Sequence, residues 1–381
     1  MSNRPVGIAL AWVLAMCTIG VSAGQRAPSG PDVTARAVSA AEAFLATLDP
    51  PRRLKANIDL NDKTRTVWSN LPTGITMQVG ATERNGLKLG DMTPVQEKAA
   101  LALLAATVSP DGFQKAMAIV DADQVLEVRS APSRAASAAI RFGRAEYYVS
   151  ILGKPSTAEK WMVQFGGHHL AINVTLAGRD NVLAPTHTGT QPATYTVDGK
   201  TIRPLGDEND KAFALVNALT ADQLKQAILS SEVRNLMLGP GSDGKAIAPE
   251  GVRVSTFTPA QRAMLVGLVR EWVDILSADA AAAKMTEIQA SLNDTYFAWA
   301  GATTNGKGAY FWIQGPAVFI EYAPQGPANA NTDHIHTIYR EPANDYAAKA
   351  LSRSAQMLYL AFGVATLALF TTLRRASASA A

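Results

Sequence analysis

The stretch Met162–Val174 reads MVQFGGHHLAINV, and it decides the fold class that we expect. Apolar residues on both sides of its Gly-Gly pair predict two β-strands joined at the glycines. Two further strands are predicted at 310–313 and 317–322, on either side of a Gly-Pro turn signal. The segment His334–Tyr339 alternates in polarity and is rich in β-formers, so it predicts another strand.

Helices around these strands are predicted by three N-terminal capping boxes. Each box has a Thr followed three residues later by a Gln, as in Thr93 with Gln96, Thr220 with Gln223 and Thr258 with Gln261. Strands grouped together between helices predict the α+β class, with a mixed or antiparallel sheet flanked by helices. Beyond these caps we predict no internal repeat, and the sequence contains no glycine-rich phosphate loop or dinucleotide motif.

Size and charge narrow the class of protein further. The chain has 381 residues, 18% of them charged, and a net charge of +3. This length allows one large domain, which we place at 41–354. The small charge, with no Lys/Arg run interleaved with aromatic residues, argues against a nucleic-acid partner. Cys17 is the only cysteine, so a chain cut after it has no thiol for disulfides, catalysis or metal ligation.

Both ends of the chain predict export and attachment to a membrane. Residues 1–23 resemble a secretory signal peptide, and an uncleaved N-terminal anchor is the alternative. Residues 24–40 are rich in Gly, Pro, Ser and Ala, which predicts a flexible leader. Residues 355–373 predict a transmembrane helix, with a core helix as the alternative. Two arginines follow this span and predict that the tail 374–381 is cytoplasmic. The body is therefore expected in the periplasm or outside the cell, with the membrane as a partner.

All five histidines fall in three short segments, which contain His168 and His169, His187, and His334 and His336. On a strand, His334 and His336 share one face, and such a pair commonly presents two imidazoles to a metal. His169 is expected as the third ligand with His168 behind it, or the reverse if a bulge turns the pair. The two pairs together predict one composite site for a divalent ion such as zinc, copper or nickel. The alternatives are a solvated strand face and histidines held by core hydrogen bonds, and His187 is expected on a surface loop.

Four other polar residues are candidates for chemistry beside the metal. Arg340 shares the predicted face of the C-terminal histidine pair and is expected to hold an anionic substrate group. Glu321 or Asp345 is expected to act as the base. Asn173 shares the predicted face of His169 and is expected to border the same site.

The two histidine motifs, Gly167-His168-His169 and His334-Ile335-His336-Thr337, resemble a bacterial family known as domain of unknown function 3500. The resemblance covers most of the body and also rests on Trp68, Leu71-Pro72, 84–87, 152–155, Gly315-Pro316, 320–322, Arg340, Pro342 and Asn344-Asp345. Ala347 stands where the family ending usually has a glycine. The resemblance implies the site but no assigned reaction. It also implies an association with membrane segments that resemble nickel/cobalt or copper permeases.

Two functions follow from these observations. The first is a metal-dependent hydrolase, with an ion on His169, His334 and His336 and an open position for water. The second is a metal-binding or metal-delivery protein for copper, nickel or zinc at the membrane surface. Metal-free acid/base chemistry and purely structural histidines are the remaining alternatives.

Overall fold

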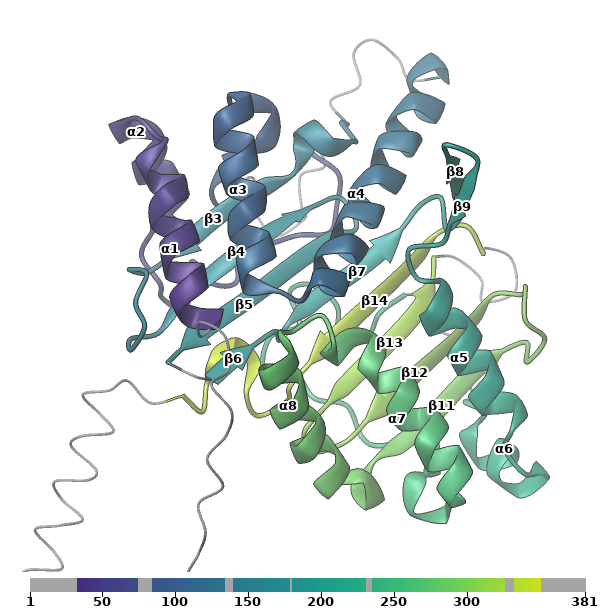
Figure 1. Cartoon of the computed structure of the whole chain (residues 1–381). Coiled ribbons are helices and arrows are strands. Elements are labelled where there is room, and N and C mark those ends of the chain that lie inside the picture. The colour runs from purple at the N-terminus through teal and green to yellow at the C-terminus, as the bar shows by residue number, and fades with distance from the viewer. Residues whose placement is uncertain are drawn as a thin grey trace, which may run out of the picture. The chain divides into compact units, whose positions relative to one another are not determined.

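The computed structural model describes residues 33–74, 84–133, 140–178, 180–230, 235–325 and 332–350 (Figure 1). The predicted signal peptide 1–23, membrane helix 355–373 and tail 374–381 lie outside the described residues. Within the described ranges, no helix is both long and apolar enough to cross a membrane.

The described residues form eight α-helices and one large sheet. The helices are α1 (Val33–Ala46), α2 (Pro50–Ala56), α3 (Pro94–Thr107), α4 (Pro110–Ser130), α5 (Gly206–Asn217), α6 (Ala221–Ala227), α7 (Pro259–Val273) and α8 (Ala278–Ala290). The sheet strands are β1 (Asn57–Ile58), β2 (Leu87–Lys88), β3 (Tyr148–Leu152), β4 (Trp161–Gly167), β5 (Leu170–Ala177), β6 (Asp180–Val182), β7 (Thr186–Thr190), β10 (Val252–Arg253), β11 (Tyr296–Gly301), β12 (Ala309–Gln314), β13 (Phe319–Pro324) and β14 (Ile335–Arg340). A separate hairpin consists of β8 (Tyr195–Val197) and β9 (Lys200–Ile202).

The sheet is mixed, which confirms the α+β class. Its twelve strands include a path in the order β1-β3-β4-β5-β7-β14-β13-β12-β11-β10, with β2 beside β3 and β6 beside β5. Strand β1 is parallel to β3, and the other neighbouring strands are antiparallel. Figure 1 shows the longer helices over one face of this sheet. Loop segments that carry Trp68 and Leu238 pack against apolar side chains of β12, β13 and β14.

The chain contains an internal structural repeat, so the prediction of none was wrong. Apart from β6, which is inserted between β5 and β7, the series β2-α3-α4-β3-β4-β5-β7 recurs as β10-α7-α8-β11-β12-β13-β14. The strand β2 pairs with β3 as β10 pairs with β11, with Lys88 opposite Tyr148 and Arg253 opposite Tyr296. The last strands of the two series, β7 and β14, pair at the centre of the sheet. The repeat was missed because it lies in strand pairing and element order, whereas the sequence shows only the shared helix caps.

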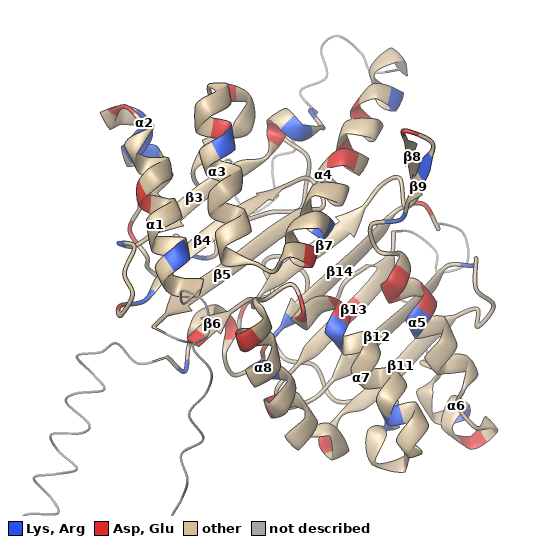
Figure 2. Ribbon diagram, in the orientation of Figure 1, with Lys and Arg blue, Asp and Glu red and all other residues tan. Residues whose placement is uncertain are grey.

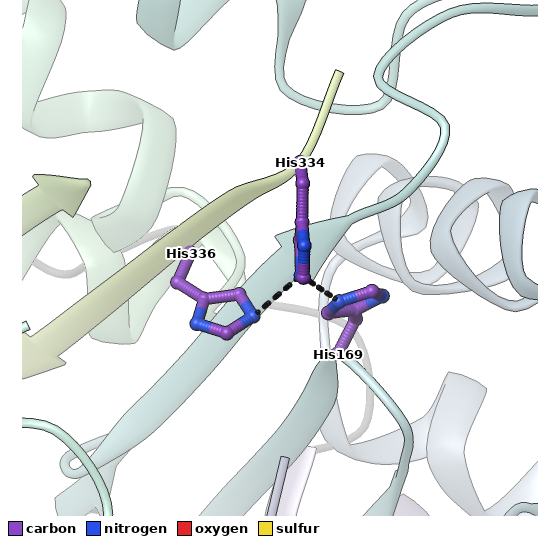
Figure 3. Close-up of side chains that lie close together, drawn as sticks. All are labelled: His169, His334 and His336. Carbon is purple, nitrogen blue, oxygen red and sulfur yellow. Dashed lines mark hydrogen bonds between the residues drawn. The ribbon is translucent and has the colours of Figure 1, made fainter. Parts of the chain in front are cut away.

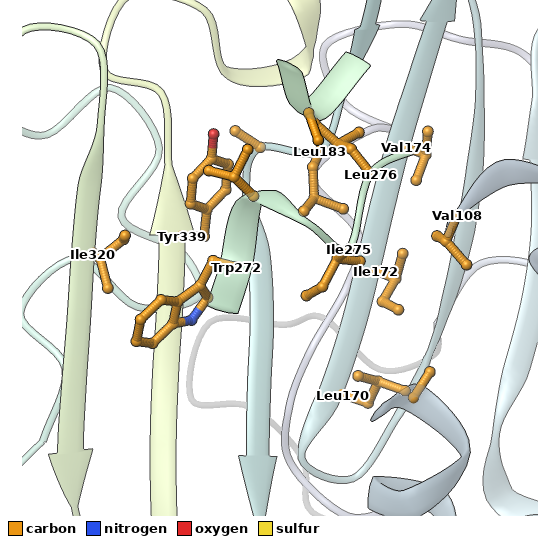
Figure 4. Close-up of a cluster of buried hydrophobic side chains, with 14 of the residues drawn as sticks. Val108, Leu170, Ile172, Val174, Leu183, Trp272, Ile275, Leu276, Ile320 and Tyr339 are labelled. Atoms are coloured by element: carbon orange, nitrogen blue, oxygen red, sulfur yellow. The ribbon is translucent and has the colours of Figure 1, made fainter. Parts of the chain in front are cut away.

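Helix α7 begins at the predicted capping box, and its apolar side is buried in the core between the helices and the sheet. The Thr258–Gln261 capping box is present, and apolar residues at helical spacing bury one side of the helix. Trp272 on that side packs close to Tyr339 and Ile320 (Figure 4), and its indole N–H donates to Thr337 Oγ1 at 2.9 Å. Burial of such an aromatic side chain with its polar group satisfied stabilises the contact between α7 and β14.

Two boundaries differ from those expected. Helix α1 begins at Val33, so the predicted leader 24–40 is wrong from that residue onward, because Ala37 and Ala41 are fully buried in the core. Strand β4 runs through both glycines, and the hairpin turn is His168-His169 instead of the Gly-Gly pair. A Cβ at Gly167 would lie 2.8 Å from the Tyr147 ring, so glycine is needed there for close approach within the strand.

Candidate metal centre

The β4–β5 turn and the start of β14 bring the two histidine motifs together. His168 and His169 are the two turn residues, while His334 precedes β14 and His336 lies within it. Strand β7 separates β5 from β14 and carries His187. His169 has a φ of 65°, a left-handed conformation that costs a non-glycine residue about 1–3 kcal/mol. The surrounding structure therefore holds this turn in a strained form that aims the imidazole.

Three imidazoles converge on one point (Figure 3). His334 Nε2 lies 2.7 Å from His169 Nε2 and 3.1 Å from His336 Nε2. The three ligand atoms all lie within 4.8 Å of one another. Nitrogens bound tetrahedrally to zinc lie about 3.3 Å apart, given Zn–N distances of about 2.0–2.1 Å. The His334–His169 and His334–His336 separations would therefore have to widen by about 0.6 Å and about 0.2 Å to surround an ion.

The imidazoles at this centre are held in the neutral form that binds metals. Burial, followed by the charge of the neighbouring imidazoles, lowers the pKa of His169 and of His336 well below the usual value. Burial also lowers the pKa of His334 to about 4. The same cause lowers the pKa of His187 to about 3. At neutral pH these rings carry no charge, so their lone pairs are available to a cation.

His168 is paired with a carboxylate that the sequence analysis did not select. Its Nδ1 donates to Asp123 Oδ1 at 2.6 Å, and the other oxygen of Asp123 accepts from the backbone N–H of Gly143 at 2.7 Å. Asp123 lies on α4, on the side of the helix that buries Ile119 and Ala116. An aspartate at a core-facing position of an amphipathic helix is the signal that could have identified it. Asp123, His168 and His169 form a second group whose ligand atoms lie within 4.8 Å of one another.

Asn70 is another contact that sequence reasoning missed. Its carbonyl oxygen accepts from the backbone N–H of His169 at 3.0 Å, and its side-chain amide lies 3.5 Å from His336 Nδ1. Arg84 donates from Nε and Nη2 to the carbonyl oxygen of Ser69, both at 3.1 Å, and so holds this loop in place. Asn70 lies within the Trp68-x-x-Leu71-Pro72 pattern, but nothing in that pattern indicates that Asn70 contacts the histidines. Only the fold shows this contact.

His187 does not lie on a surface loop, and that prediction was wrong. It lies in β7 and is fully buried. Its Nδ1 contacts the carbonyl oxygen of His169 at 3.2 Å, while its Nε2 has no hydrogen-bond partner among the described residues. All five residues of β7 are buried between the neighbouring strands β5 and β14, and His187 is buried with them.

A cavity of about 510 Å³ opens beside the histidines. His168, His334 and His336 line it, together with uncharged polar residues such as Asn235 and apolar residues such as Phe142. None of its described lining residues is Lys, Arg, Asp or Glu. Figure 2 shows charged residues of both signs on the helices, while β4, β5 and β7 carry none. Among the described lining residues, histidines are thus the titratable groups that face the cavity.

Arg340 is held by other protein groups. Its Nε donates to the carbonyl oxygen of Leu238 at 2.7 Å, and Nη2 donates to that of Gly239 at 3.1 Å. Its Nη1 is paired with Asp345 at 2.7 Å and with Asp243 at 3.1 Å. The guanidinium is buried and fixes the 238–243 loop against β14, so its donors are not directed toward the cavity.

The other three candidate side chains are also engaged in the fold. Glu321 accepts from the backbone N–H groups of Met237 and Leu238, both at 2.8 Å, and from the Tyr310 hydroxyl. Burial raises the pKa of this carboxyl, and the hydrogen bonds that it accepts only partly offset the increase. Asn173 donates to the carbonyl oxygen of Pro185 at 2.8 Å. The structure therefore brings the four histidines of the two pairs together but does not bring Glu321, Asn173, Arg340 or Asp345 into the wall of their cavity.

The fold and the site define a class: an α+β protein built from two structural repeats, with buried His and Asp groups that can hold a metal ion. The chain belongs to the family described as "Protein of unknown function (DUF3500)", whose model matches residues 31–348. No curated protein and no solved structure matches the chain.

Proposed function

We propose that this protein is a metal-dependent hydrolase. The observation that carries the proposal is the convergence of His169 with His334 and His336, two histidines that line a cavity. Three protein nitrogens with an open position are the ligand set of catalytic zinc. His334 and His336 line the cavity, so an ion bound to them would have a position open to water and substrate.

The chemistry would come from the bound ion. A divalent ion at this position lowers the pKa of a bound water toward neutrality and polarises a carbonyl or phosphoryl oxygen. The cavity volume of about 510 Å³ lies within the range of about 300–1,000 Å³ found for small-molecule sites. Asn70, which contacts both His169 and His336, would hold these ligands in register. The proposal does not use Glu321, Asp345 or Arg340, since other protein groups already occupy their hydrogen-bonding atoms.

The test is elemental analysis of the purified protein beside a His334→Ala/His336→Ala variant. We expect at least one zinc, copper or nickel ion per wild-type chain and a large loss of metal in the variant. Chromogenic esters, amides and phosphodiesters are then offered to both proteins and to an Asn305→Ala control, which changes an exposed residue. Hydrolysis that requires the ion supports the proposal. Absence of metal after incubation with all three ions would refute it.

Metal binding or delivery is the second candidate, and one observation favours it. The arginine and glutamate expected to serve an enzyme are instead engaged with the 237–243 loop. A metal-delivery protein does not need these groups. Transfer of the bound ion to a chelator, measured beside hydrolysis of the substrate panel, separates the two. Rapid transfer without turnover would favour delivery, whereas tight retention with turnover would favour the enzyme.

We also propose that the body is exported and anchored to a membrane by 355–373, with the tail 374–381 in the cytoplasm. The support is the signal-like sequence 1–23 and the apolar C-terminal segment followed by two arginines. In this arrangement the membrane is the partner of the C-terminal segment, and the site faces a small molecule or metal outside the cytoplasm. Membrane fractionation, with protease added to intact and lysed cells, tests this. Protection of the body in intact spheroplasts would contradict it.

A further inference from the structure

His169 belongs to two groups of potential metal ligands. With His334 and His336 it forms the group described above, and with Asp123 and His168 it forms the second group. The rings of His168 and His169 are adjacent, with centroids 3.6 Å apart. All of these side chains are buried except His334, which is partly exposed. Together the two groups contain four histidines and one carboxylate.

The two nitrogens of His169 have different surroundings. Its Nε2 contacts His334 Nε2, whereas its Nδ1 is buried and has no hydrogen-bond partner among the described residues. An imidazole that binds one ion through Nε2 keeps its proton on Nδ1. A single ion would therefore leave a buried N–H donor unpaired, which proteins rarely tolerate without a reason.

We propose that the protein binds a second divalent ion between Asp123, His168 and His169, so that the site is a two-metal centre bridged by the His169 ring. The proposal extends the proposed function and rests on its first ion. His169 would bind the first ion through Nε2 and the second through Nδ1. This arrangement gives the unpaired nitrogen a ligand role.

The ligand chemistry and the protons are consistent with this assignment. Asp123 Oδ1 and His168 Nδ1 lie 2.6 Å apart and would separate to admit the ion, while the Nδ1 proton of His168 would move to Nε2 of the same ring. The proton on His169 Nδ1 would leave, so binding of the second ion would release one proton to solvent. Gly143 N–H still donates to Asp123 Oδ2 and keeps the carboxylate oriented. Two nitrogens and one oxygen suit zinc, copper or nickel, and the described residues contain no cysteine that would favour a softer ion.

The experiment measures ions per chain in the full-length protein. Metal is removed with a chelator, the protein is dialysed against buffered zinc, and zinc and protein are quantified. We expect two ions in the wild type, one in Asp123→Asn and one in His168→Gln. The control Asp111→Asn changes an exposed aspartate on the same helix and should keep two. Circular dichroism of each variant verifies that it is folded.

Each outcome decides between the claims. One ion in the wild type, unchanged in Asp123→Asn and His168→Gln, would overturn the second site while leaving the first intact. No ion in the wild type would refute the proposed function as well. Copper(II) provides an independent readout, because two ions bridged by one imidazole couple magnetically and lose part of their electron paramagnetic resonance signal. A full signal from every bound copper in the wild type would also contradict the bridge.

Discussion

Asn70 contacts His169 of the candidate metal centre through its backbone and His336 through its side chain. When an ion binds His336 through Nε2, the proton of that ring moves to Nδ1, and the Asn70 amide can turn its oxygen toward it. Partners of this kind orient ligating imidazoles, and their loss weakens metal affinity by about 10–100-fold.

We therefore expect Asn70→Ala to raise the Kd for zinc by about 10–100-fold while the protein remains folded. Competition with a chromogenic chelator measures the Kd. The matched control is Asn305→Ala, which removes an exposed amide that contacts Asn209 and Asp210 instead of the histidines. An unchanged Kd in Asn70→Ala would show that the amide does not orient His336.

The buried histidines also predict how stability depends on pH. His187 is fully buried with a pKa of about 3, whereas in the unfolded chain its pKa is about 6.5. Between these two values the unfolded chain binds more protons than the folded chain, so stability falls as the pH falls from about 6.5 toward 3. Above about pH 7 this residue contributes no pH dependence.

The measurement is the free energy of unfolding against pH in the metal-free protein. His187→Gln should reduce its slope between pH 6 and pH 4 by up to about 1.4 kcal/mol per pH unit, the value for one proton. Wild type and variant should run parallel above pH 7. Equal slopes at acidic pH would mean that His187 is charged in the folded state.

At the scale of elements, a glycine precedes the first strand of each repeat. Gly86 has a φ of 91° and Gly251 a φ of 104°. A Cβ at Gly251 would lie 2.3 Å from the carbonyl oxygen of Phe297, and one at Gly86 would lie 2.0 Å from that of Val149. Both positions thus need glycine for its backbone conformation and for close approach to the neighbouring strand.

Substitution of Gly251 by Ala should destabilise the protein by about 1–3 kcal/mol or more, because it adds strain and a steric clash. Gly267→Ala is the matched control, since Gly267 lies inside α7 and a Cβ there meets nothing within 4 Å. It should stabilise the protein by about 0.5–1 kcal/mol. Denaturant unfolding of both variants tests the pair, and equal effects would contradict this assignment.

At the scale of the whole molecule, the centre joins the two repeats. His169 comes from the first repeat and His334 from the second, 165 residues later. The central pair of β7 and β14 connects the same two repeats, with Thr188 and Thr337 hydroxyls 2.7 Å apart. A ligand that bridges both halves stabilises the folded state of both.

Zinc at 100 times its Kd should therefore raise the free energy of unfolding by about 2.7 kcal/mol. Calorimetry should show one thermal transition that moves upward by several degrees. In the His334→Ala/His336→Ala variant, which lacks two ligands of the first ion, the same zinc concentration should shift the transition by less than in the wild type. A wild-type trace with two transitions, of which zinc shifts only one, would show that the repeats unfold separately.

The local patterns of the sequence were sufficient for the class of fold and for the position of the site. Capping boxes, turn residues and alternating polarity act over a few residues, so the helix starts at Thr93, Thr220 and Thr258 agree with the structure. The same local patterns failed at the β4–β5 turn. There Gly167 allows close packing against Tyr147 and Gly166 allows close approach to the backbone of β5, so the histidines form the turn.

The sequence by itself determined the α+β class, the helix caps and the two histidine motifs. The tertiary structure decided which groups meet, because contacts across the sheet depend on strand order and register. Strand order β5-β7-β14 brings His169 to His334 and buries His187, and the packing of α4 against β5 and β7 brings Asp123 to His168. The tertiary structure also pairs Arg340 with Asp243, a partner 97 residues away that no spacing along the chain could assign.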